Sequence, residues 1–169
     1  MPPENQHQIE AGHFSADVVE FISLLAKHEV QSVIVGGAAV IFHGHIRFTG
    51  DVDFFYSTAS ENIKALFGAL LEFWDGNVPG IRSHEELSEP ALVVQFGRQP
   101  NRIDLLNRID GVPFEEAWSS RIPLTMATPK GTVSLAMLSL PELLKNKRAS
   151  GRPKDLDDLR FFEHAPYTR

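Results

Sequence analysis

"GGAAVIFHGHIRFTGDVDFF", residues 36–55, decides the fold because it joins two glycines, a short apolar stretch and two aspartates. "SVIV" at 32–35, just before it, is rich in β-branched residues and predicts a short buried strand that the glycine pair ends. "AAVIFHG" at 38–44 predicts a short helix, and "DVDFFY" at 51–56 predicts a second strand. The stretch therefore predicts strand, helix and strand in succession, with acidic side chains at the start of the second strand.

Asp51 and Asp53 stand next to the most apolar part of the chain, where an unpaired carboxylate is costly to bury. Successive side chains of a strand point to opposite faces, so these two point the same way. Two parallel carboxylates suit a hard divalent cation such as Mg²⁺, which binds one or two carboxylates together with substrate phosphates. The alternative is that both are exposed aspartates near a turn, bonded to local amides.

Gly36 and Gly37 end a predicted strand and open a predicted helix. A glycine pair lets the backbone approach a phosphate, and a helix N-terminus offers free N–H groups. The alternative is an ordinary tight turn. Together with Asp51 and Asp53, the glycine pair favours a site for a metal ion and a triphosphate, because these ligands would compensate each other's charge.

Asp104 is the candidate third carboxylate, because a two-metal site needs one more acidic ligand. It lies in the middle of the predicted strand "RIDLL", where Ile103 and Leu105 point to the opposite face. The alternative makes Asp104 the partner of Arg102 or Arg98 on an exposed face of the sheet.

Working outward, hydrophobic periodicity predicts further helices and strands. We expect helices at 15–27, 60–74, about 141–149 and 153–163, a helical turn or two at 114–118, strands at 91–96 and 102–106 that form a hairpin, short strands at a sheet edge within 122–127 and 132–138, and a loop at 75–90. This order predicts an α/β or α+β domain with a mixed β-sheet flanked by helices. We expect a flexible polar tail over residues 1–14 and a single domain over residues 15–169.

The composition limits the class of protein. With 169 residues, 43% of them hydrophobic, the chain is long enough for one domain with its own core. The absence of cysteine excludes disulfides, thiol catalysis and cysteine–zinc sites. No segment is typical of a signal peptide or reaches the ~20 apolar residues that cross a bilayer, so we expect a cytoplasmic protein without a membrane partner. The net charge of −6 disfavours a domain that depends on nucleic-acid phosphates.

The motifs together resemble the nucleotidyltransferase superfamily with the polymerase-beta-type fold. The resemblance rests on Gly36-Gly37, on Arg47-x-Thr49-x-Asp51-x-Asp53, and on Asp104 in a later strand. The superfamily has Gly-Gly or Gly-Ser at a helix start, Asp-x-Asp on the next strand and a single Asp on a further strand. More closely, the chain resembles small prokaryotic nucleotidyltransferases related to type IV toxin–antitoxin systems. Their C-terminal helices carry a pattern that is similar to this chain at Lys147, Arg152, Pro153, Lys154, Asp155 and Asp158.

The resemblance implies an activity and its site. Asp51, Asp53 and Asp104 would be the catalytic, metal-binding residues for Mg²⁺ (or Mn²⁺). A nucleoside triphosphate would be bound by Gly36, Gly37, Arg47, Thr49 and Lys147. The acceptor of the nucleotide would be a hydroxyl group of an RNA, a protein or a small molecule, and a toxin–antitoxin role would imply a partner protein.

Several alternatives stay open at this point. Arg47 either contacts phosphate or neutralises Asp51, and Lys147 either reaches the triphosphate or decorates a solvated helix end. We expect His43 and His45 to have packing or hydrogen-bonding roles, because Gly44 separates them and no third nitrogen ligand is near in sequence. The chain as a whole is either an enzyme, with antibiotic modification as one possible activity, or a non-catalytic antitoxin or nucleotide-binding partner protein.

Overall fold

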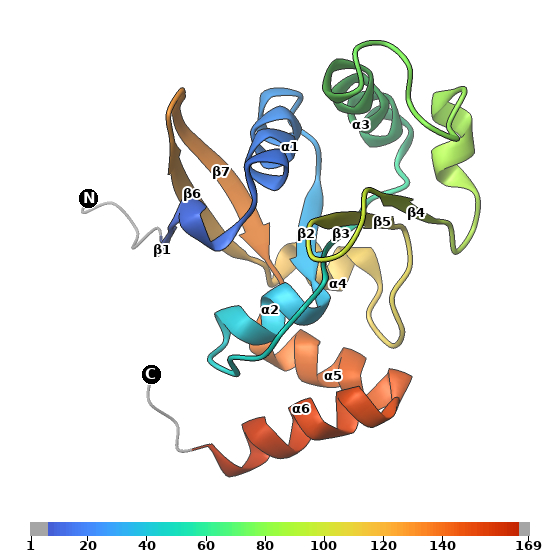
Figure 1. Ribbon diagram of the computed structural model, residues 1–169. Helices are drawn as coiled ribbons and strands as arrows, with labels where there is room; N and C mark the ends of the chain where they lie inside the picture. The colour runs from blue at the N-terminus through green and yellow to red at the C-terminus, as the bar shows by residue number, and fades with distance from the viewer. Residues whose placement is uncertain (1–6, 166–169) are drawn as a thin grey trace, which may run out of the picture.

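The computed structural model describes residues 7–165, in which a seven-stranded sheet is accompanied by six α-helices (Figure 1). The strands are β1 (His7–Ile9), β2 (Ser32–Val35), β3 (Asp51–Tyr56), β4 (Val93–Phe96), β5 (Arg102–Leu106), β6 (Ile122–Thr128) and β7 (Gly131–Met137). The helices are α1 (Ala16–Lys27), α2 (Gly36–Phe42), α3 (Ser60–Phe73), α4 (Phe114–Ser119), α5 (Leu140–Ser150) and α6 (Pro153–His164), with short 3₁₀ helices η1 (Ala11–His13) and η2 (His84–Ser88). No helix in this range is long and apolar enough to cross a lipid bilayer.

The sheet is mixed, with the strand order β1-β6-β7-β2-β3-β5-β4. Three neighbouring pairs are antiparallel (β2–β3, β4–β5 and β6–β7) and three are parallel (β1–β6, β2–β7 and β3–β5). The expected α+β class with a mixed sheet is confirmed, and so is the predicted hairpin, as β4 and β5. The strands expected at a sheet edge are β6 and β7, and both lie inside the order, since β1 covers the outer side of β6.

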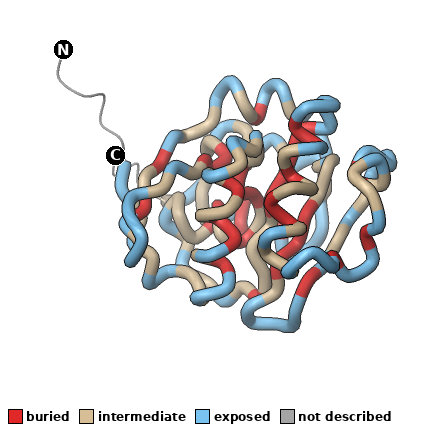
Figure 2. The backbone as a smooth tube through the Cα atoms, turned by 90° about the horizontal axis from the view of Figure 1, so that it is seen from above, coloured by how far each residue is buried: buried red, intermediate tan, exposed pale blue. Residues whose placement is uncertain are grey.

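The core lies on both faces of the sheet, because neighbouring residues of β3 point to opposite sides. Phe54 meets Phe21 of α1 edge to face, with ring centroids 5.2 Å apart. Phe55 meets Phe114 of α4 in the same way, also at 5.2 Å. Figure 2 shows the buried segments running through the middle of the molecule, with exposed segments around them. The apolar pair on β3 therefore anchors one helix layer on each side of the sheet.

Two segments differ from the expected tail and loop. Residues 7–9 add β1 to the sheet, because the outer edge of β6 offers backbone groups that a further strand can pair; residues 1–6 lie outside the described residues. The segment expected as a loop at 75–90 contains η2, whose Leu87 is fully buried. The hydroxyl of the buried Tyr56 donates to the Leu87 carbonyl at 2.7 Å, which explains why this turn closes over the sheet.

The last two helices, α5 and α6, pack near the segment that leads from α2 into β3. Figure 1 shows α5 and α6 stacked below α2, at the end of the sheet where β2 leads into α2. An ion pair fixes this arrangement, since Arg47, in the segment between α2 and β3, donates two hydrogen bonds to Asp158 of α6. The C-terminal helices are thus joined to the segment that precedes the candidate aspartates.

Candidate active site

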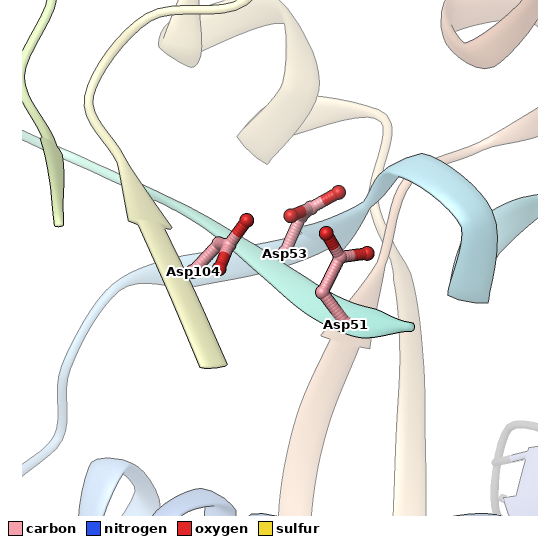
Figure 3. A group of neighbouring side chains, drawn as sticks. All are labelled: Asp51, Asp53 and Asp104. Atoms are coloured by element: carbon pink, nitrogen blue, oxygen red, sulfur yellow. The ribbon is translucent and has the colours of Figure 1, made fainter. Parts of the chain in front are cut away.

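The three aspartates lie side by side at the start of two parallel strands. Asp53 of β3 is paired in register with Asp104 of β5, and Asp51 is paired with Arg102. The alternation of β3 places Asp51 and Asp53 on the same face, as predicted. Figure 3 shows the three carboxyl groups pointing to the same side of the sheet. One oxygen from each carboxylate can be chosen so that all three lie within 4.8 Å of one another, a spacing that can hold a metal ion.

Arg102 supplies the positive charge that these carboxylates need. Its Nε and Nη2 donate to the two oxygens of Asp104 at 2.8 and 3.1 Å, and Nη2 also donates to Asp51 Oδ2 at 2.7 Å. Gln95 of β4 adds a hydrogen bond from its Nε2 to Asp104 Oδ2 at 3.2 Å. The sequence alternative that paired Asp104 with Arg102 therefore describes a real contact. The pair lies within the aspartate cluster, however, and not apart from it.

Asp53 is the member of the cluster whose pKa is raised. Its burial, the negative charges of Asp51 and Asp104, and a hydrogen bond with Asp104 raise the pKa of Asp53 to about 7, against a smaller lowering by Arg102. Three carboxylates thus share one guanidinium group, and the excess negative charge favours a proton or a further cation. A divalent cation with oxygen ligands fits this donor set.

The glycine pair is required by close contacts with the site. Gly36 begins α2 with a φ of +66°, and a Cβ atom there would lie 2.1 Å from Asp53 Oδ2. A Cβ atom on Gly37 would lie 2.5 Å from Thr49 Oγ1. That hydroxyl is 3.3 Å from both the backbone oxygen and the Oδ1 of Asp51. The glycines therefore allow α2 to begin against Asp53 and Thr49, and their contact with a phosphate stays a prediction.

Arg47 does not neutralise Asp51, so that alternative is wrong. Its Nε and Nη2 donate to the two oxygens of Asp158 at 2.8 and 3.0 Å, and Arg102 takes the role beside Asp51. The other terminal nitrogen of Arg47, Nη1, lies near Gly37, since a Cβ atom added to this glycine would be 3.5 Å from it. Arg47 thus lies beside the start of α2, and its contact with phosphate stays a prediction.

Lys147 is buried, so the alternative of a solvated helix end is wrong. Its side chain is 5% exposed, and Nζ lies 2.9 Å from Asp155 Oδ1 and 3.0 Å from Asp158 Oδ2. Asp155 also accepts hydrogen bonds from Ser150 and Arg152. Two of the three Lys147 donors already hold carboxylates, and its contact with a triphosphate stays a prediction.

The expected packing roles of His43 and His45 are confirmed. His43 Nε2 is 2.7 Å from the Leu138 carbonyl oxygen. The His45 ring stacks on Phe161 with centroids 4.1 Å apart, and Nδ1 is 3.3 Å from Asp158 Oδ1. Within residues 7–165, the acidic cluster is the group of three or more candidate metal ligands, and it contains no histidine.

Sequence reasoning placed Arg102 only as a possible partner of Asp104 and missed its bridge to Asp51. The available signal was its spacing, because Arg102 and Asp104 are two residues apart and share one face of a strand. The bridge also depends on the parallel pairing of β3 with β5, which aligns Asp51 with Arg102. That pairing joins segments about 50 residues apart, and no local pattern reports it.

A mixed sheet with helices on both faces and carboxylates on two adjacent strands defines an α+β, nucleotidyltransferase-like fold. The comparison with family models agrees. Residues 15–163 match the family described as "nucleotidyltransferase of unknown function (DUF6036)", and this chain belongs to that family. A comparison with curated proteins finds no match.

Proposed function

We propose that this protein is a Mg²⁺-dependent nucleotidyltransferase that moves a nucleoside monophosphate from a nucleoside triphosphate to a hydroxyl acceptor. The observation that carries the proposal is the convergence of Asp51, Asp53 and Asp104 in a chain of a nucleotidyltransferase family. In this proposal the fold is of the polymerase-beta type, the protein works in the cytoplasm, and the acceptor is an RNA, a protein or a small molecule. A role in a toxin–antitoxin system, with a partner protein, belongs to the same proposal.

The donor set fits the implied ion. Three carboxylates face one another with a single guanidinium between two of them, and burial together with the neighbouring carboxylates raises the pKa of Asp53. Asp51, Asp53 and Asp104 would hold Mg²⁺ (or Mn²⁺). When bound, the ion would supply positive charge that offsets the charge of these carboxylates and of the triphosphate.

The chain's own residues would position the reactants. Gly36 and Gly37 would let the backbone approach the phosphates, with Arg47 and Thr49 beside Gly37 and Lys147 as a further phosphate contact. The carboxylate of Asp104 would accept the proton of the acceptor hydroxyl. The acceptor oxygen would then form a bond to the α-phosphorus while the bond to the pyrophosphate oxygen breaks, so that pyrophosphate leaves in line.

One observation favours a second candidate, a non-catalytic nucleotide-binding or antitoxin protein. Arg102 already bridges Asp51 and Asp104, so a cation of the protein itself occupies part of the space between these carboxylates. A protein that binds a nucleotide or a partner without transfer would tolerate this bridge. An active enzyme would need Arg102 to move or to share its ligands.

The test is a transfer assay combined with a binding assay. The protein is incubated with Mg²⁺, cell extract as the source of acceptors and a triphosphate labelled at the α-phosphate, and the labelled product is identified. Binding is followed by melting temperature, which should rise with Mg²⁺ and triphosphate because a ligand of the folded state stabilises it. The variants are Asp53→Asn and, as a control of the same chemistry, Asp17→Asn on the exposed side of α1.

The outcomes separate the two candidates. We expect labelled product and a raised melting temperature in the wild type and in Asp17→Asn, and loss of the product and of most of the shift in Asp53→Asn. A shift without any labelled product would favour the non-catalytic candidate. Equal melting shifts in the wild type and in Asp53→Asn would contradict the site itself.

A further inference from the structure

The sheet is split between β2 and β7. These parallel strands are paired at one position, Ile34 with Met137. By contrast, β7 is paired with β6 along its whole length. In Figure 1 the β6–β7 hairpin rises away from β2. A wedge-shaped gap therefore interrupts an otherwise continuous sheet.

Within residues 7–165, no strand pairing between β2 and β7 continues along the gap beyond this position. Leu138 N donates to the Ile34 carbonyl at 3.0 Å, so this residue of β7's extension directs its backbone toward β2. Alternate residues of a strand direct their N–H and C=O groups to the same neighbour. Thr132 and Ser134 therefore direct theirs toward β2, beyond the single paired position. On the other side, Ser32 lies two residues before Ile34 and faces back across the gap.

A cavity of ≈ 680 Å³ occupies the gap, within the range of ~300–1,000 Å³ typical of ligand sites. Its lining comes from both faces of the sheet, with Ile22 and Phe54 on the side of α1 and Trp118 on the side of α4. The lining combines apolar side chains with hydroxyl and charged groups. It lies toward the end of β2 where Ser32 pairs with Tyr56, whereas Asp53 pairs with Val35 at the other end. The cavity is thus separate from the acidic cluster.

Arg121 is one of three charged residues in the cavity lining, together with Lys27, which pairs with Glu72, and Glu29. Its guanidinium carbon lies 3.7 Å from the centre of the Trp118 ring, and Nη1 donates to the Trp118 carbonyl at 2.6 Å. None of the ion pairs recorded within residues 7–165 involves Arg121. A guanidinium group held on an aromatic ring is a strong site for a carboxylate.

We propose that this gap binds an extended peptide strand of a partner protein. The strand would pair with the backbone of Thr132 and Ser134, bury alternate apolar side chains in the cavity and place an acidic side chain against Arg121. The unpaired backbone edge selects a strand as the ligand, because main-chain hydrogen bonds give affinity in this mode and side-chain pockets give specificity. This proposal is independent of the nucleotidyltransferase activity.

The experiment uses the full chain and a library of random octapeptides displayed on phage. Selected peptides are synthesised, and their affinities are measured for the wild type and three variants. Ser134→Pro removes an N–H group on the gap side while leaving the hydrogen bonds of β7 to β6 in place. Arg121→Gln removes the charge, and Arg98→Gln, in the exposed turn between β4 and β5, is the matched control.

We expect selected peptides to alternate apolar residues and to contain an acidic residue. Their affinity should fall roughly tenfold in Ser134→Pro and in Arg121→Gln and should not change in Arg98→Gln. Hydrogen exchange should show Thr132 and Ser134 amides exposed in the free protein, unlike those of Val133 and Leu135, and protected when peptide binds. If Ser134→Pro fails to fold, the affinity of Arg121→Gln and the hydrogen exchange of the wild type still test whether the peptide binds in the gap.

Three results would overturn the proposal. The first is that no peptide is selected. The second is that selected peptides keep full affinity for Arg121→Gln or leave the amides of Thr132 and Ser134 exposed. The third is protection of these two amides in the free protein, since the edge of β7 would then already be paired.

Discussion

Two groups of carboxylates lie near the start of α2, and they differ in how their charge is balanced. The acidic cluster (Asp51, Asp53 and Asp104) has three carboxylates and one guanidinium group, that of Arg102, which bonds Asp51 and Asp104. In the C-terminal cluster (Asp155, Asp158, Lys147, Arg47 and Arg152), two carboxylates share one ammonium and two guanidinium groups. The first cluster has fewer cationic groups than carboxylates, whereas the second has more cationic groups than carboxylates.

The pKa values follow this difference in opposite directions. Burial and the neighbouring carboxylates raise the pKa of Asp53 to about 7. Burial also acts to raise the pKa of Asp155 and Asp158, but hydrogen bonds from Ser150, Arg152 and Lys147 to Asp155, and from Arg47 and Lys147 to Asp158, outweigh it and hold both values below the ordinary one. A group of buried carboxylates therefore indicates a cation site only where the protein leaves negative charge unbalanced.

Removing Lys147 is expected to have the largest effect on stability. Lys147→Met leaves Asp155 and Asp158, whose side chains are 1% exposed, without a shared partner. Breaking a buried ion pair in this way costs about 3–5 kcal/mol of unfolding free energy. Chemical denaturation measures this loss. The matched control is Lys145→Met on the same helix, where the side chain is 48% exposed and the loss should be at most about 1 kcal/mol.

The same variant tests the predicted contact of Lys147 with the triphosphate. If that contact exists, calorimetry under folding conditions should show the affinity for Mg²⁺ and triphosphate falling roughly 10- to 150-fold, as a lost charge-assisted hydrogen bond predicts. An unchanged dissociation constant would assign Lys147 to the C-terminal cluster alone. Equal losses of stability in Lys147→Met and Lys145→Met would contradict the burial on which the comparison rests.

Gly36→Ala should damage the acidic cluster without changing its charge. The new Cβ atom would lie 2.1 Å from Asp53 Oδ2, so the carboxylate must move, and alanine at positive φ costs about 1–2 kcal/mol. We expect weaker binding of Mn²⁺, measured by calorimetry, together with that loss of stability. Gly76→Ala is the matched control, since Gly76 has a φ of +87° and no atom within 4 Å of the new Cβ. Equal Mn²⁺ affinity in the two variants would contradict the site.

Arg102→Gln should sharpen the difference between the clusters by removing the one cation among the three aspartates. The negative charge left at Asp51 and Asp104 should raise the affinity for Mn²⁺ by about tenfold, or ~1.4 kcal/mol. Calorimetric titration of the wild type, of Arg102→Gln and of the exposed control Arg98→Gln measures the change. A fall in Mn²⁺ affinity would show that Arg102 supports the cation site and does not compete for it.

The last expected effect is a change in how stability depends on pH. Without a divalent cation, the folded protein holds a proton on Asp53 up to about pH 7, whereas the unfolded chain loses it near the ordinary value of 3.8. This group therefore favours folding at low pH, and its contribution is lost as the pH rises from about 4 to 7. Asp53→Asn should remove that part of the slope in denaturation experiments across this range. A slope identical to that of the wild type would contradict the raised pKa.

Local pattern was enough for several parts of this molecule. The alternation of a strand placed Asp51 and Asp53 on one face, and the apolar flanks of Asp104 indicated the face on which it lies. Helical periodicity located α1 and α3, and Ser15 caps α1 by accepting a hydrogen bond from Val18 N. These features depend on residues a few positions apart, so the sequence carries them directly.

Only the tertiary structure decided the rest, because it depends on contacts between distant segments. The parallel pairing of β3 with β5 aligned Asp53 with Asp104 and set Arg102 against Asp51. Packing of α6 against the segment before β3 buried Lys147, which by its local sequence belongs to a basic helix end. The gap between β2 and β7 has no local signal either, since each strand alone is a normal strand. Alternation and periodicity predict the direction of a side chain. Which distant charge it contacts, and which distant strand its own strand pairs with, depends on the tertiary structure.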